Sequence, residues 1–259
     1  MDAIVLSGGI PLPEEPLYSY SSGHPKAMLD IAGKPMVQWV LDALGTARKV
    51  DNVIILGLTA KSELKCARPL HYLQDEGHLL ANIVAGVNKS LELNPNAERV
   101  LIVSSDIPAI KAEMVDWLVD QTEETPLDLY YGVIPREVME KRFPDSRRTW
   151  THLKGMEVCG ADIHAAHVRM ATEHIEMWEK LLGSRKAPLK QAAAIGYDTM
   201  LLMFLRQITL DDAVARVCER IGIQGKAVVW PWAEAGMDVD KPHQLELMRK
   251  DLQPKKKKK

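Results

Sequence analysis

The sequence predicts an α/β protein with a mostly parallel sheet and helices on both of its faces. Short runs of branched apolar residues, typical of strands buried on both sides, alternate with longer segments whose apolar residues recur at helical spacing. The order strand-helix-strand-helix-strand-helix-strand is that of a three-layer α/β/α domain. A chain of 259 residues can bury a sizeable core without help from a disulfide or a metal.

The first half of the chain has the most regular pattern. Residues 3–6 are a branched apolar run that ends in Ser7-Gly8-Gly9, which predicts a buried strand and then a turn. A helix is expected from Pro35, because the first helical turn tolerates proline and apolar residues then recur three and four positions apart. The next strands are expected at 53–56, 100–103 and 127–133, and the helices between them at 79–91 and 114–119.

The second half is less regular. Residues 142–160 mix proline, charge and short extended pieces, so we expect a small inserted lobe beside the active cleft. Residues 161–165 are expected to return to the main sheet, and Thr209 to cap a helix. A strand at 227–230 and a helix at 242–252 then complete a single domain over 1–253, which a solvated, disordered lysine tail at 254–259 follows.

Composition excludes several classes of protein. The 33 basic and 35 acidic side chains give a formal net charge of -2, which argues against nucleic-acid binding through a global field. Cys66, Cys159 and Cys218 form no paired motif, so we expect neither a structural zinc site nor a disulfide framework. No secretory signal is evident, and no apolar stretch reaches the ~20 residues of a membrane span. These features predict a reduced, cytoplasmic protein that binds no membrane.

Three unusual segments fall where strands are expected to end. Ser7-Gly8-Gly9 offers backbone N–H groups that can approach a phosphate closely. Ser104-Ser105-Asp106 places one carboxylate, and residues 236–240 (Gly-Met-Asp-Val-Asp) place two more. Each feature alone is typical of an ordinary turn or helix cap. Together, at the edge where open parallel sheets bind ligands, they favour a site for a magnesium–triphosphate.

The complete set of motifs resembles the NTP transferase family, whose members include the MobA-like and the sugar-1-phosphate nucleotidyltransferases. The resemblance is strong from residue 1 to about residue 122 and resumes at the C-terminal end. In chain order, the segments that carry it are Leu6-Ser7-Gly8-Gly9, Pro25-Lys26-Ala27-Met28-Leu29, Ile31-Ala32-Gly33-Lys34-Pro35-Met36, Asp75-Glu76-Gly77, Ser105-Asp106-Ile107-Pro108 and Gly236-Met237-Asp238-Val239-Asp240-Lys241-Pro242.

This resemblance implies a Rossmann-like sheet of the GT-A type, and transfer of NMP from an NTP to a phosphorylated acceptor with release of pyrophosphate. The acceptor would be a sugar phosphate or a cofactor precursor. Catalytic roles are implied for Lys26, which would neutralise phosphate charge, and for Asp106. Asp106 and Asp238 would hold Mg²⁺, with Asp240 in support. The nucleotide-binding residues implied are Leu6, Ser7, Gly8, Gly9, Lys26, Asp75, Gly77 and Asn82.

One departure from the family pattern leaves two rival functions open. Residues 10–24 replace a short loop that normally carries an arginine, and they contain Glu14 and Glu15 instead. Either this longer loop folds away from the triphosphate, or NTP binding is altered and the chain is a catalytically silent nucleotide-binding module. A nucleotide-sugar-dependent glycosyltransferase is disfavoured, because such enzymes commonly have Asp-x-Asp where this chain has Ser104-Ser105-Asp106.

Acceptor recognition is expected in the divergent middle of the chain. Arg148, beside Arg147, and Lys154 offer a guanidinium fork and a point charge for an acceptor phosphate, although a solvated basic loop is equally compatible with the pattern. Asp162 lies in a segment that resembles the acceptor side of the family site, or else it caps a turn. The sequence does not define the oligomeric state, and a homodimer is compatible with it.

Two further groups favour structural roles. His164 and His167 would share one face if their segment were helical, but without a third ligand nearby packing is the preferred interpretation. Trp230 and Trp232 flank Pro231, and a core corner is preferred over stacking on a ligand.

Overall fold

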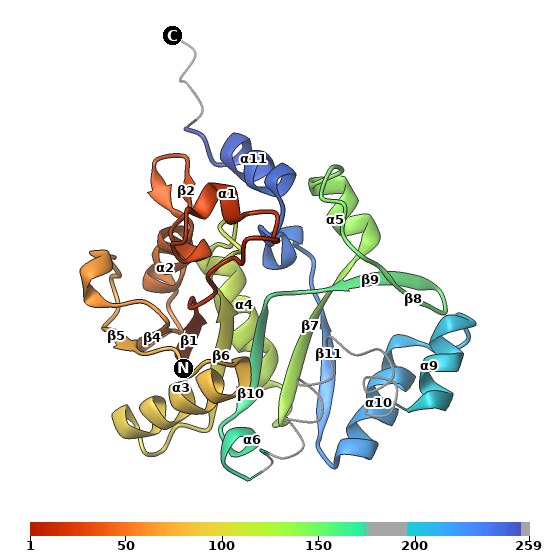
Figure 1. The fold of residues 1–259 in the computed structure, drawn as a ribbon. Coiled ribbons are helices and arrows are strands. Elements are labelled where there is room, and N and C mark those ends of the chain that lie inside the picture. Colours follow the sequence, from red (N-terminus) through yellow and green to blue (C-terminus); the bar gives the residue numbers. More distant parts are fainter. Residues whose placement is uncertain (174, 176–195, 255–259) are drawn as a thin grey trace.

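Nine strands form one mixed sheet in the part of the chain that the structure describes (Figure 1). The structure is a computed structural model, and it describes residues 1–173, 175 and 196–254. The expected tail at 255–259 lies outside these residues. The strands are β1 (Asp2–Leu6), β4 (Val53–Leu56), β5 (Leu70–Leu73), β6 (Arg99–Ser104), β7 (Leu129–Pro135), β8 (Thr151–Leu153), β9 (Met156–Gly160), β10 (Ile163–His167) and β11 (Gly225–Val229).

The strand order is β5-β4-β1-β6-β10-β7-β9-β8, and β11 pairs with β7. The pairs β5–β4, β4–β1, β1–β6 and β7–β11 are parallel, whereas β10 runs antiparallel to both β6 and β7. Leu6 pairs with both Leu56 and Ser104, so β1, β4 and β6 end at the same edge. The predicted α/β class, a mostly parallel sheet with helices on both faces, is confirmed.

Helices cover both faces of the sheet. Consecutive residues of β1 are buried although their side chains point to opposite faces, so both faces must be covered. Val5 belongs to the apolar cluster under α2 (Met36–Thr46) and α4 (Ala112–Glu123), whereas Ile4 packs in a second cluster with Val87 of α3 (Leu79–Leu93). The remaining α-helices of the described chain are α1 (Tyr18–Ser21), α5 (Arg136–Arg142), α6 (Arg169–Thr172), α9 (Tyr197–Phe204), α10 (Leu210–Ile221) and α11 (Pro242–Asp251).

Three short 3₁₀ turns and a small hairpin complete the elements around the carboxyl edge. The turns are η1 (Lys26–Met28), η2 (Ala60–Ser62) and η3 (Ala233–Gly236). The hairpin joins β2 (Asp30–Ile31) to β3 (Lys34–Pro35) through Ala32 and Gly33, which both have positive φ angles of 54° and 87°. Two consecutive positive φ angles are typical of the tight turns that match strand twist.

Two parts of the second half differ from expectation. Residues 142–160 were expected to be an irregular lobe, but they contain the β8–β9 hairpin, which extends the main sheet through pairing of β9 with β7. His164 and His167 do not share a helical face, because both lie in β10 and not in a helix. Residues three apart in a strand point to opposite faces of the sheet.

The local predictions for Thr209 and Trp230 are confirmed. Thr209 caps α10, its side chain accepting a hydrogen bond from the backbone N–H of Asp212, and Gly222 ends this helix in the left-handed region. Trp230 is fully buried and packs against Trp117, with ring centroids 4.9 Å apart, which is the expected core role. No helix within residues 1–173, 175 and 196–254 has both the length and the apolar character that crossing a bilayer demands.

Candidate active site

The turns that follow β1 and β4 meet at the carboxyl edge with so little space that glycine is required. A Cβ atom added to Gly57 would lie 2.1 Å from the Cα atom of Gly8, and Gly57 has a φ angle of +86°. Ser7 is buried, and its backbone N–H donates to the carbonyl of Leu56 at 3.0 Å. The predicted glycine turn is therefore held against the neighbouring strand end, with its backbone at the surface of the sheet edge.

Asp75 brings a third strand end to the same place. A Cβ atom on Gly8 would lie 2.6 Å from Oδ2 of Asp75. The other oxygen of Asp75 accepts hydrogen bonds from the side-chain amide of Asn82 at 2.8 Å and from the backbone N–H of Gly77 at 3.0 Å. Asn82 in turn accepts from the backbone N–H of Glu76 at 2.8 Å. Three residues that the resemblance implied for nucleotide binding, Asp75, Gly77 and Asn82, thus form one network beside Gly8.

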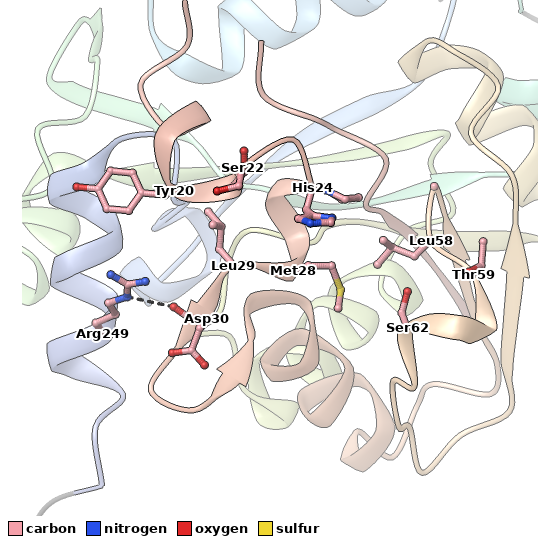
Figure 2. Close-up of a pocket in the computed structure, with 13 residues that line it drawn as sticks. Tyr20, Ser22, His24, Met28, Leu29, Asp30, Leu58, Thr59, Ser62 and Arg249 are labelled. Atoms are coloured by element: carbon pink, nitrogen blue, oxygen red, sulfur yellow. Dashed lines mark hydrogen bonds between the residues drawn. The ribbon is translucent and has the colours of Figure 1, made fainter. Parts of the chain in front are cut away.

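A cavity of about 690 Å³ lies next to this glycine turn (Figure 2). Residues 20–22, 24–25 and 28–30 form one wall, residues 57–59 and Ser62 form another, and Arg249 of α11 closes one side. Gly57 belongs both to this cavity and to the contact with Gly8. The carboxylates of the acidic cluster described below do not line this cavity.

The long loop at 10–24 forms part of the cavity wall. Its helix α1 is anchored by the buried side chain of Leu17. Both acidic residues of the loop are exposed, and Glu15 accepts a hydrogen bond from the backbone N–H of Leu12 at 3.0 Å. The carboxylate of Glu15 is therefore used within the loop itself.

Lys26 connects the glycine turn with acidic residues from distant parts of the sequence. Its backbone N–H donates to the carbonyl of Gly9 at 2.8 Å, which fixes η1 to the glycine turn. Its Nζ donates to Oδ2 of Asp106 and to Oδ1 of Asp240, each at 2.6 Å. The structure therefore brings together a lysine and two carboxylates that are 80 and 214 positions away in the sequence.

The protonation state of Lys26 follows from this environment. Burial by itself lowers the pKa of Lys26, but the carboxylates of Asp106 and Asp240 together outweigh burial and raise its pKa above the ordinary lysine value. Lys26 is therefore a fixed positive charge at neutral pH and not a general base.

Asp238 and Asp162 pair with a second cation, Arg148. The guanidinium of Arg148 makes an ion pair with Asp238 and lies 3.8 Å from Oδ2 of Asp162. Burial, followed by the nearby carboxylate of Asp106, raises the pKa of Asp162 to about 7, although Arg148 opposes this shift. Asp162 and Arg148, two of the three residues expected on the acceptor side, thus lie in one cluster with the expected metal ligands.

Backbone hydrogen bonds tie the loops that carry these side chains. The N–H of Val239 donates to the carbonyl of Asp106 at 3.0 Å, and the N–H of Asp162 donates to the carbonyl of Ala235 at 2.8 Å. The hydroxyl of Ser104 donates to Oδ1 of Asp106 at 2.6 Å, which orients this carboxylate.

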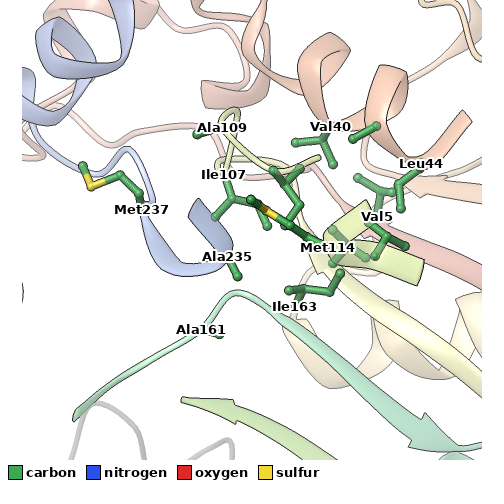
Figure 3. Close-up of a cluster of buried hydrophobic side chains, with 14 of the residues drawn as sticks. Val5, Val40, Leu44, Ile107, Ala109, Met114, Ala161, Ile163, Ala235 and Met237 are labelled. Atoms are coloured by element: carbon green, nitrogen blue, oxygen red, sulfur yellow. The ribbon is translucent and has the colours of Figure 1, made fainter. Parts of the chain in front are cut away.

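Buried apolar residues flank the aspartates of the acidic loops, and Figure 3 shows several of these apolar side chains. Each of the three acidic loops has apolar residues within three positions of its aspartate, and these side chains join the main core cluster. They are Ile107 and Ala109 beside Asp106, Ala161 and Ile163 around Asp162, and Ala235 and Met237 before Asp238. Rigid packing beneath the carboxylates fixes their mutual positions.

The donor set suits a hard divalent cation. Asp106 and Asp238 are each only 8% exposed, and Mg²⁺ is usually held by one or two carboxylates while waters and phosphate oxygens supply its other ligands. In the described part of the chain, no three acidic, histidine or cysteine side chains are arranged as a ready metal-binding group. The carboxylates are instead paired with Lys26 and Arg148. Asp106 and Asp238 fit Mg²⁺ by chemistry and by burial.

Lys154 does not join the cluster. It is exposed in the turn of the β8–β9 hairpin, at the opposite end of β9 from Gly160, and its backbone N–H donates to the carbonyl of Ile208. Lys154 was a candidate because of its charge, but the local sequence does not indicate that the β8–β9 hairpin carries it away from the cluster. The contact of Arg148 with Asp238 was not foreseen, and no local pattern signals a pair 90 positions apart.

Comparisons with known proteins identify the family. The family model described as the MobA-like NTP transferase domain matches residues 3–255. The chain belongs to the MobA-like NTP transferase family. The predicted resemblance is confirmed, and the chain is a nucleotidyltransferase of this family.

Two archaeal relatives of this MobA-like chain are both described as a probable molybdenum cofactor guanylyltransferase. The protein from Thermococcus gammatolerans is 25% identical over 135 residues, which cover 46% of this chain and 68% of the relative. The protein from Thermococcus sibiricus is 26% identical over 125 residues, which cover 48% of this chain and 57% of the relative.

Solved structures extend the MobA-like comparison to nearly the full chain. A hypothetical transferase from Thermus thermophilus is 28% identical, with a TM-score of 0.81 over 94% of this chain and 98% of the other. A CMP:2-keto-3-deoxy-manno-octonic acid synthetase in complex with CTP is 16% identical, with a TM-score of 0.58 over 97% of this chain and 98% of the other. The second likeness concerns the fold alone, and it agrees with the Rossmann-like, GT-A-type class.

Proposed function

We propose that this nucleotidyltransferase is Mg²⁺-dependent, transfers NMP from an NTP to a phosphorylated small-molecule acceptor and releases pyrophosphate. The observation that supports this most strongly is the position of Lys26. Its ammonium group lies between Asp106 and Asp240, and its backbone is bonded to the glycine turn. Phosphoryl and nucleotidyl transfer depend mainly on positioning and charge neutralisation, which such an arrangement provides.

The nucleotide would lie along the meeting point of three strand ends. Backbone N–H groups of Gly8 and Gly9 would donate to phosphate oxygens, because glycine lets the phosphate approach the backbone. The network of Asp75, Gly77 and Asn82 beside Gly8 would position the nucleoside. Lys26 would neutralise charge that develops on the phosphates as the acceptor oxygen attacks the α-phosphorus.

Asp106 and Asp238 would hold the Mg²⁺, with Asp240 in support. When bound, this ion supplies positive charge to the phosphate oxygens and so lowers the barrier to displacement of pyrophosphate. The hydroxyl of Ser104 keeps the carboxylate of Asp106 oriented. The same hydrogen bond argues against the glycosyltransferase alternative, because position 104 contributes a hydroxyl and not a second carboxylate.

On the acceptor side, Arg148 and Asp162 are the residues that the geometry favours. Arg148 is suited to bind a phosphate group and Asp162 to accept hydrogen bonds from acceptor hydroxyls or amines. Since the Thermococcus relatives are described as probable molybdenum cofactor guanylyltransferases, GTP is the first nucleotide to test and a phosphorylated precursor of that cofactor is the first acceptor.

The test is pyrophosphate release with each of the four NTPs, Mg²⁺ and a panel of phosphorylated acceptors. Release that requires both Mg²⁺ and an acceptor supports the proposal. Tight NTP binding without release for every acceptor supports the catalytically silent module, to which the acidic loop at 10–24 still points.

A further inference from the structure

Arg148 is held by carboxylates instead of facing solvent. Its side chain is 14% exposed, and its guanidinium pairs with Asp238 and approaches Asp162. One terminal nitrogen also donates to the carbonyl of Gly160 at 3.4 Å. With these contacts in place, little of the guanidinium is available to bind an acceptor phosphate.

These contacts leave part of Arg148 unsatisfied. Its Nε is buried and has no hydrogen-bond partner within the described chain, and neither does Oδ1 of Asp238, although that oxygen is in ionic contact with Arg148. The preceding residue, Arg147, has a φ angle of +50°, a left-handed conformation that costs energy for a side chain of this size. A contact that combines an unsatisfied N–H with backbone strain is one that a stronger competitor can replace.

The charge of the cluster identifies the competitor. Asp106, Asp162, Asp238 and Asp240 contribute four carboxylates, and among the described residues two cations, Lys26 and Arg148, form ion pairs with them. The cluster therefore has two excess negative charges when Asp162 is ionised and one when Asp162 is protonated, so it attracts a divalent cation in either state. A divalent cation at Asp238 would also repel the guanidinium that now pairs with this carboxylate.

We infer that Arg148 is a resident counter-cation of the metal site, and that it leaves Asp238 when a divalent cation binds there. The released guanidinium then becomes available to an anionic acceptor. Binding of metal thus precedes productive binding of the acceptor. This inference rests on the proposed function in one respect, because it takes Asp106 and Asp238 as the metal ligands.

Binding of Mn²⁺ alone, measured by electron paramagnetic resonance without nucleotide, tests the inference. Arg148→Gln removes the competing charge and should lower the Mn²⁺ Kd by about tenfold, the factor expected when a charge-assisted pair no longer has to be broken. Arg147→Gln is the matched control, because this exposed neighbour makes the same change of charge one position away and should leave the Kd unchanged. An equal or higher Kd in Arg148→Gln, or no Mn²⁺ binding in either protein, overturns the inference.

Pyrophosphate release by the wild-type protein separates this result from the proposed function. Release together with an unchanged Mn²⁺ Kd in Arg148→Gln refutes the role of Arg148 and leaves the proposed function standing. Tighter Mn²⁺ binding in the variant, without pyrophosphate release by the wild-type protein for any nucleotide and acceptor, supports the role of Arg148 and counts against the proposed function.

Chemical modification gives a second test that does not need the Arg148 variant to fold. In Arg147→Gln, phenylglyoxal modification of Arg148 is mapped by mass spectrometry with and without Mn²⁺. The inference predicts that Mn²⁺ increases the rate at Arg148 several-fold and leaves Arg48 unaffected, since the side chain of Arg48 is already 85% exposed. A rate at Arg148 that Mn²⁺ does not raise contradicts release.

Discussion

At the scale of single residues, the chemistry depends on how carboxylates and cations are paired. Lys26 is bonded to Asp106 and Asp240, whereas Arg148 is paired with Asp238 and Asp162. The two cations come from different parts of the chain and differ in chemistry. Lys26 is a compact charge fixed to the glycine turn, and Arg148 is a planar fork on a strained loop.

Substitution of Lys26 separates a catalytic from a structural role. Lys26→Ala should lower kcat/KM by about a hundredfold or more, the usual loss when charge stabilisation is removed from the transition state, with a Tm change of no more than a few degrees. Lys34→Ala is the control, because it removes the same charge at a partly exposed position where the ammonium of Lys34 pairs with Asp42 and lies over the ring of Trp39, outside the acidic cluster. Steady-state kinetics and thermal melts check the expectation, and equal activity of both variants removes Lys26 from the mechanism.

The raised pKa of Asp162 gives a prediction about stability. The raised pKa keeps a proton on this carboxyl up to about pH 7 in the folded protein, whereas an ordinary aspartate has a pKa of 3.8, so the folded state binds more protons than the unfolded state in this interval. The contribution of Asp162 to stability is therefore lost as the pH rises from about 4 to about 7.

The variant Asp162→Asn has no such titration. In EDTA, its Tm relative to the wild-type Tm should increase between pH 4 and pH 8, by about 2–4 °C for each kcal/mol of penalty removed. Thermal melts of both proteins at several pH values measure this difference. A Tm difference that stays constant with pH shows that Asp162 titrates normally.

At the scale of elements, the site is built from turns that leave neighbouring strands at one edge. Gly57 after β4 lies against Gly8 after β1, and Asp75 after β5 lies on the other side of Gly8. Core residues flank the aspartates of the acidic turns in the sequence, for example Met237 and Val239 around Asp238. The sheet edge therefore supplies both the phosphate-binding backbone and the rigid carboxylates.

The contact between two of these turns can be tested with a single methyl group. Gly57→Ala should destabilise the fold by roughly 2 kcal/mol or more, because the new Cβ would overlap Gly8 and the φ angle of +86° disfavours any side chain. Gly9→Ala is the matched control, since no atom of the described structure lies within 4 Å of the Cβ it adds. Denaturant unfolding should separate the two variants, and a similar free energy of unfolding for both contradicts this packing.

Elements of the first half were predictable because each has a strong local pattern. The branched apolar runs of β1, β4 and β6 and the helical stripes of α2, α3 and α4 are all present. The sequence missed β5, whose Leu70-His71-Tyr72-Leu73 pattern is that of a half-buried edge strand and not of a buried apolar run. It also missed the regular β8–β9 hairpin, which depends on pairing with the distant strand β7.

At the scale of the whole molecule, one sheet carries residues from both ends of the chain to a common edge (Figure 1). The antiparallel strand β10 lies between β6 and β7, and it brings Asp162 next to the end of β6, where Asp106 follows. The motifs predicted that Lys26, Asp106 and Asp238 would meet at one edge, with Asp240 in support. The structure places Lys26 between Asp106 and Asp240, and it pairs Asp238 with Arg148. The place of Arg148 was not predictable, because a loop of irregular sequence carries it to Asp238.

The most direct test of this account compares two buried aspartates. Asp106→Asn should lower Mg²⁺-dependent pyrophosphate release by a hundredfold or more with little change in Tm. Asp116→Asn, whose carboxylate accepts hydrogen bonds from Arg48 and from the backbone of Lys49, should lower the Tm and leave turnover per folded molecule unchanged. Pyrophosphate release by Asp106→Asn at the wild-type rate would contradict the central claim that this sheet edge is the active site.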